Sequence, residues 1–201
     1  MTVLSIDVNA EVGSEQDEAY EASDDTGFAG TGHVGVMYTS TSAGSRYNGG
    51  SIFRGLPTTP IAITDAALRV YVYGTGNDDV KGEIDCEDVD DADDYAGTAD
   101  VTSRVRTGTA ATITAADSVG TGNYTLLCNF KDQVQTVVDR AGFAGPVNVI
   151  CSGLNAATKQ LAWRTQINAA DDPRLTITYQ NVASKGAKDL LLVGCSGRPK
   201  K

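Results

Sequence analysis

The segment from Phe130 to Tyr179 constrains the fold of this chain most, because it carries three element patterns in close succession. The apolar residues of FKDQVQTVVDRAGF recur at helical spacing, and Gly142 stands where a left-handed cap would end a helix. The run VNVICSG is continuously apolar, as in a buried strand, whereas RLTITY alternates as in a strand with one solvent face. We therefore predict one short helix, Lys131–Arg140, followed by two strands.

The remaining composition fits a single all-β domain. Its 201 residues include 22 glycines, and 41% of them are hydrophobic, which is enough to form a core. No apolar stretch reaches the length of a membrane span. The opening MTVLSIDVNAEVGSEQDE lacks the basic and apolar regions of a signal peptide. We expect synthesis in the cytoplasm and no membrane partner.

Charge is distributed unevenly along the chain. The first hundred residues hold 20 of the 26 acidic residues and 4 of the 16 basic ones, and the formal net charge of the whole chain is −10. This acidic balance argues against a nucleic-acid partner, which requires a basic face. It suits either head-to-tail contacts between copies or simple solubility.

The four cysteines have no metal-binding spacing, and the single histidine, His33, has no neighbouring partner in the sequence. Cys128 and Cys151 lie within apolar runs and are predicted to be free, buried thiols, although a disulfide between them is the alternative. No sequence motif identifies a nucleophile or a general base, so we expect no enzymatic activity.

The acidic run NDDVKGEIDCEDVDDADDY has two interpretations. Its first part alternates as a strand, which predicts Ile84 and Cys86 inward and Asp85 and Glu87 outward. Its second part is either a solvated acidic loop or a calcium site, because hard cations bind clustered carboxylates. The spacing does not fit an EF-hand. The candidate calcium ligands are Asp88, Asp90, Asp91, Asp93 and Asp94.

Exposed aromatic side chains would indicate a carbohydrate site, because rings stack against sugars. The candidates for such exposed aromatics are Tyr38, Tyr47, Tyr95, Tyr124 and Trp163, and we assign Tyr47 and Trp163 as the candidate glycan contacts. The alternative for Trp163 is a position in or beside the core.

The final residues, 181–201, form a predicted C-terminal arm beyond a domain at 1–180, whose first 50 residues are acidic strands and loops. An apolar patch on such an arm requires a partner surface. The predicted partner-binding residues are Leu190, Leu191, Leu192 and Val193, with Arg198, Lys200 and Lys201 facing an acidic surface.

Several segments, in order, resemble a family of jelly-roll β-sandwich domains in tailed-phage virion proteins, which are related to secreted carbohydrate-binding jelly rolls. The matching segments are SIFRGLPTTPIAITDAALRVYVY, IDCEDVDDADDY, SRVRTGTAATI and QVQTVVDRAGFAGPVN. The resemblance implies a jelly-roll sandwich with one short helix and a C-terminal extension.

For function, the resemblance implies a non-enzymatic capsid decoration or cement protein on the virion exterior. Such a protein would bind the major capsid protein and its own neighbouring copies as a homo-oligomer. The alternatives are a carbohydrate-binding module, with a glycan as partner, and a tail or head-fibre component. No cofactor is implied, apart from the calcium considered above.

Overall fold

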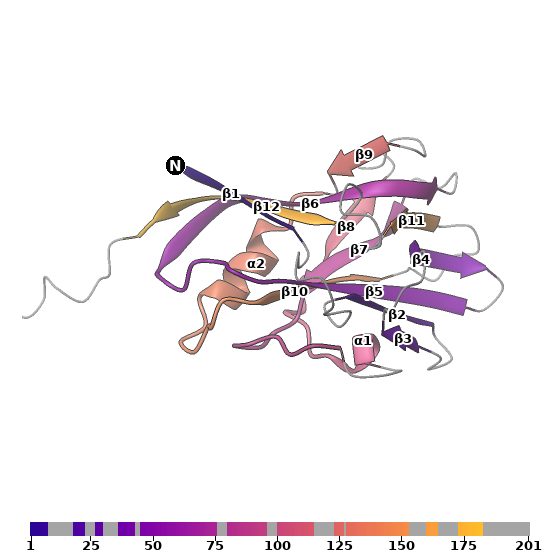
Figure 1. Cartoon of the computed structure of the whole chain (residues 1–201), viewed down its shortest axis with the longest axis horizontal. Coiled ribbons are helices and arrows are strands. Elements are labelled where there is room, and N and C mark those ends of the chain that lie inside the picture. The colour runs from indigo at the N-terminus through magenta and orange to yellow at the C-terminus, as the bar shows by residue number, and fades with distance from the viewer. Residues whose placement is uncertain are drawn as a thin grey trace, which may run out of the picture.

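A computed structural model shows a protein made mostly of strands, arranged in two antiparallel sheets with few helices (Figure 1). The structure describes residues 1–7, 18–22, 27–29, 36–42, 45–75, 80–95, 100–114, 123–126, 128–152, 160–164 and 173–182. Within these residues, no helix is long and apolar enough to cross a membrane. The prediction of an all-β sandwich is confirmed at this level.

The first sheet has β6 (Ile61–Thr75) near its centre. Its strand order is β1 (Thr2–Asp7), β12 (Arg174–Asn181), β6, β11 (Gln160–Arg164) and β4 (Val36–Ser42). A further strand, β9 (Asn123–Leu126), pairs with the second half of β6. Every pairing in this sheet is antiparallel.

The second sheet is built around β10 (Val147–Ser152). Its strand order is β3 (Gly27–Ala29), β2 (Glu18–Ala22), β5 (Ser45–Phe53), β10, β7 (Val80–Cys86) and β8 (Ala111–Thr114). The two sheets are linked where β4 runs into β5, through a short ladder that pairs Thr41 with Arg46.

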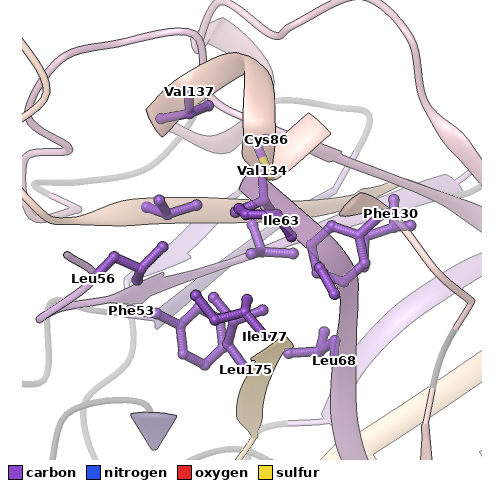
Figure 2. Close-up of a cluster of buried hydrophobic side chains, with 14 of the residues drawn as sticks. Phe53, Leu56, Ile63, Leu68, Cys86, Phe130, Val134, Val137, Leu175 and Ile177 are labelled. Carbon is purple, nitrogen blue, oxygen red and sulfur yellow. The ribbon is translucent and has the colours of Figure 1, made fainter. Parts of the chain in front are cut away.

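The main core lies between the two sheets and includes one face of α2 (Lys131–Val138), which packs against β6 and β7. Figure 2 shows side chains from β6, β12 and α2 meeting those of the second sheet, with Phe53 beside Leu175 and Ile177. The alternation predicted for RLTITY is confirmed, because Leu175 and Ile177 are fully buried.

The predicted helix is also confirmed, but it ends differently. The helix ends at Val138, and the next residue, Asp139, keeps a right-handed helical conformation. Among the described glycines, only Gly55, Gly108 and Gly145 have a positive φ, so the prediction of a left-handed cap at Gly142 is wrong. A Cβ atom at Gly142 would lie 2.2 Å from a carboxylate oxygen of Asp90, so glycine is needed there for a close approach.

The outer face of the second sheet is also covered. Residues 87–95 and 100–108, here called the covering segment, include α1 (Asp100–Ser103), which contacts β2 and β5. A second buried apolar cluster joins this segment to the sheet and consists of Ile52, Ala92, Tyr95, Val101 and Ile150. Because β10 has a core on both faces, all six of its residues are buried, as its continuous apolar run predicted.

The covering segment changes one prediction. Ile84 and Cys86 face the main core as expected, and Asp85 points to the opposite face. Asp85 is nevertheless only 3% exposed, because the covering segment lies over it. The alternation was correct, but the expected contact of Asp85 with solvent was wrong.

Candidate functional site: the polar cluster beneath the covering segment

Tyr95 anchors the covering segment on the second sheet. Its side chain is fully buried, and its hydroxyl donates to Oδ1 of Asn148 on β10 at 2.6 Å. The ring end lies over Gly50 of β5, where an added Cβ would stand 1.6 Å from the Tyr95 oxygen. Only a residue without a side chain leaves room for the phenol. The expectation that Tyr95 is an exposed, sugar-stacking aromatic is therefore wrong.

The side chains around the Tyr95 phenol also bind one another. Nδ2 of Asn148 donates to Oε2 of Glu87 at 2.9 Å, and Nη1 of Arg104 donates to the same oxygen at 2.8 Å. The Arg104 guanidinium also lies over the Tyr95 ring, 4.2 Å from its centroid, in cation–π geometry. The Arg104 and Glu87 side chains are 8% and 13% exposed. These four side chains thus bind one another and are largely shielded from solvent.

Arg104 also fixes the backbone of the acidic loop. It donates to the carbonyl of Asp93 at 2.8 Å and to that of Asp94 at 3.0 Å. The carboxylate of Asp94 forms a more exposed ion pair with Arg54, which follows β5. Two arginines therefore hold one short stretch of loop, one by its backbone and one by its side chain.

The buried carboxylate of Asp85 secures the other half of the covering segment. It accepts hydrogen bonds from the backbone N–H of Cys86 at 2.7 Å, from that of Gly108 at 3.3 Å and from the Thr107 hydroxyl. Close by, Arg106 donates to the hydroxyl of Ser152 on β10. A buried carboxylate with several donors is well compensated for its lost hydration.

Arg140, just after α2, connects the helix to the start of the acidic loop. Its Nε donates to Asp90 at 2.5 Å, and its Nη1 donates to Asp88. These hydrogen bonds, to Asp90 first and Asp88 second, raise the pKa of the Arg140 guanidinium. The carbonyl of Asp90 also accepts the N–H of Ala144 at 2.8 Å. The loop is therefore held against the helix by side chain and backbone together.

The structure distributes the predicted calcium ligands among arginines. Asp88 and Asp90 converge on Arg140, Asp94 binds Arg54, and Asp91 and Asp93 are exposed. In the part of the chain that the structure describes, no three His, Cys, Asp or Glu side chains are arranged to hold a metal ion. The carboxylates that do converge here bind a cationic side chain.

For the other predicted site residues, the structure describes the backbone at most. Tyr47 belongs to β5, where it pairs with Ala22, and Trp163 belongs to β11, where it pairs with Met37. The side chains of Tyr47 and Trp163 fall outside the described residues. The same is true of His33 and of the whole predicted arm contact, namely Leu190, Leu191, Leu192, Val193, Arg198, Lys200 and Lys201.

The three described cysteines are free, as predicted. Cys86 and Cys151 are buried in the main core, and Cys128 packs half-buried against it. Burial raises the pKa of the Cys86 thiol, with a smaller contribution from the Asp85 carboxylate, and burial likewise raises that of Cys151. Neutral thiols in a dry core are poor nucleophiles, so these residues act as small apolar groups.

Sequence reasoning missed the arginines that organise the cluster, Arg54, Arg104, Arg106 and Arg140. A signal was nevertheless present, because these arginines lie in three segments that already stood out in the sequence, SIFRGLPTTPIAITDAALRVYVY, SRVRTGTAATI and QVQTVVDRAGFAGPVN. Those segments are far apart in the chain, and the structure brings Arg54, Arg104 and Arg140 together around the acidic loop, whereas Arg106 binds Ser152 of β10. No family model matches this chain, and no curated protein matches it either.

Proposed function

We propose that this chain is a jelly-roll structural protein of a tailed-phage virion, acting as a non-enzymatic capsid decoration protein. The proposed fold is supported by the strand order. Eight strands, β4 to β11, form two sets of four with the orders β4-β11-β6-β9 and β5-β10-β7-β8. Successive strands alternate between the sets except at β7 and β8, the arrangement of two intertwined Greek keys.

The observation that best supports this function is that the polar side chains of the cluster bind one another. In the polar cluster, Arg104 and Arg140 are bound to Glu87, Asp88 and Asp90, and the buried phenol of Tyr95 is bound to Asn148. Charged and polar side chains that bind one another stabilise a single fixed structure. This supports a rigid scaffold that works through its surface, as a decoration protein does.

The family resemblance adds a second line of support. The segments that resemble phage virion proteins contribute Arg54, Glu87, Arg104 and Arg140 to the ion pairs that hold the acidic loop. Residues that cooperate to hold one loop over one sheet are those that a shared architecture would retain. The partners proposed on this basis are the major capsid protein and neighbouring copies of the chain, at the capsid exterior.

Capsid binding tests the proposal. Undecorated capsids, assembled from the major capsid protein of the same genome, would be sedimented with the full chain and with a variant lacking residues 189–201. We expect the full chain to co-sediment and the truncated one to remain in the supernatant. Circular dichroism should show that both are folded.

Two results would contradict the proposal in different ways. A full chain that never co-sediments would exclude decoration of that capsid. A truncated chain that still binds would exclude only the predicted arm contact at Leu190–Val193. Glycan binding by the unassembled chain, lost on Trp163→Ala, would instead favour the carbohydrate-binding alternative.

A further inference from the structure

The strand β1 ends the first sheet and leaves one of its edges without a described neighbour. It pairs with β12 along its whole length, from Thr2 opposite Tyr179 to Asp7 opposite Arg174. No other strand that the structure describes pairs with it. A strand edge of this kind presents a row of backbone donors and acceptors that favours pairing with another chain.

The sequence of β1 carries few of the features that usually protect such an edge. It reads TVLSID, with no lysine, no proline and a single charge, Asp7. Val3 is 67% exposed, whereas Leu4 packs against the main core. By contrast β8, at the end of the second sheet, has only four residues, and a very short edge strand is itself protected. Of the two strands that end the main strand order, β1 and β8, the better pairing edge is therefore β1.

The alternation in β1 also limits the registers in which a second copy of β1 can pair with it. In an antiparallel ladder, residues directly opposite each other point to the same face of the sheet. Two copies of β1 can therefore continue one sheet only if one residue lies opposite the same residue of the second copy, with the twofold axis midway between them. With the axis at Leu4, Leu4 lies opposite Leu4 of the second copy, Val3 opposite Ser5 and Thr2 opposite Ile6. Asp7 falls opposite Met1, so the two Asp7 positions lie at opposite ends of the ladder.

We propose that β1 pairs antiparallel with β1 of a second copy of this chain, through a twofold axis at Leu4, to give one continuous sheet across a dimer. The contact is isologous and closes at two copies. Its main-chain hydrogen bonds would supply the binding and the matched alternation its register, as in β-augmentation. The dimer would form in solution without a capsid, so it does not depend on the proposed virion role.

The first test measures mass in solution by size-exclusion chromatography with light scattering on the full chain. We expect twice the chain mass of 20.9 kDa. The double variant Val3→Lys/Ser5→Lys places like charges directly opposite each other twice and should halve that mass. Val105→Lys is the matched control, because Val105 is 68% exposed but lies in the covering segment, and it should leave the dimer intact. A monomeric wild-type chain, or a double variant that remains dimeric, would overturn the proposal.

The second test addresses the register by disulfide trapping. Opposite Cα atoms in an antiparallel ladder are about 4.5–5.5 Å apart, within the range that a disulfide spans. Mixing Val3→Cys with Ser5→Cys should give a cross-linked pair on mild oxidation, with far less product from either variant alone. Peptide mapping would assign the link between positions 3 and 5 against the background of the native cysteines. If Ser5→Cys alone cross-links as fast as the mixture, the axis at Leu4 is excluded.

Discussion

The hydroxyl of Tyr95 donates to Oδ1 of Asn148 at 2.6 Å, in a layer where both side chains are buried. Tyr95→Phe removes the donor and leaves a buried amide oxygen without it. We expect the free energy of unfolding to fall by about 1–3 kcal/mol, the cost of an unsatisfied buried acceptor. Urea denaturation measures it. Tyr179→Phe, at a half-exposed position on β12, is the control and should change stability little. Equal losses in the two variants would contradict the role given to Tyr95.

The same phenol explains why β5 carries a glycine at position 50. Gly50→Ala would place a Cβ 1.6 Å from the Tyr95 oxygen and 2.5 Å from Cζ, so the ring must move. We expect a loss of about 1–3 kcal/mol, typical of an overfilled site. In a Tyr95→Ala background the obstructing ring is gone, and Gly50→Ala should then cost much less. Strictly additive effects in this double-mutant cycle would show that the two positions do not meet.

The helix and the strands β10 and β12 could be predicted from the sequence because their patterns are local. A repeat of apolar residues is sufficient to place Val134 and Leu175 in the core. The burial of Asp85 could not be predicted in this way. Its alternation was visible, but the layer above it comes from Thr107 and Gly108, which reach Asp85 through the fold and not through a local repeat.

The arginine contacts were harder to predict for the same reason. Arg140 and Asp88 are 52 residues apart in the chain, and no periodicity links them. An acidic run read alone is compatible with a solvated loop or with a bound cation such as calcium. In the folded chain the positive charge beside Asp88 and Asp90 is a guanidinium from the end of a helix. A run of like charges therefore does not show which of its residues bind a cationic group or what that group is.

Arg140→Met should loosen the acidic loop without unfolding the sandwich. The substitution keeps most of the side-chain volume but removes the donors to Asp88 and Asp90, while the core face of α2 is unchanged. We expect faster hydrogen exchange at Ala144, whose N–H donates to Asp90, and unchanged exchange in β10. Lys131→Met is the control, since Lys131 pairs only with its exposed neighbour Asp132 among the ion pairs described. Unchanged exchange at Ala144 would contradict the anchoring role of Arg140.

Calcium should not stabilise the protein. Asp88 and Asp90 are already engaged by Arg140, and Asp94 by Arg54, so a cation would have to displace bound guanidinium groups. We expect the midpoint of thermal unfolding to be the same with calcium and with a chelator, and no heat of binding by titration calorimetry. A clear rise of the midpoint with calcium, abolished by Asp90→Asn, would instead support a calcium site in this loop.

The buried thiols should make the protein less stable in alkali. Burial raises the pKa of Cys86 and Cys151 above the ordinary value of 9.0, so the folded chain retains protons that the unfolded chain releases. Their contribution is constant while both states remain protonated. It falls once the pH exceeds about 9, by about 1.4 kcal/mol per pH unit for each thiol.

Denaturation curves between about pH 7 and pH 10 would measure this slope. Other groups also titrate in this range, so the informative comparison is with Cys86→Ala and Cys151→Ala. Each variant should have a shallower alkaline slope than the wild-type chain, whatever its stability at neutral pH. Identical slopes would show that these thiols ionise equally easily in the folded and unfolded chains.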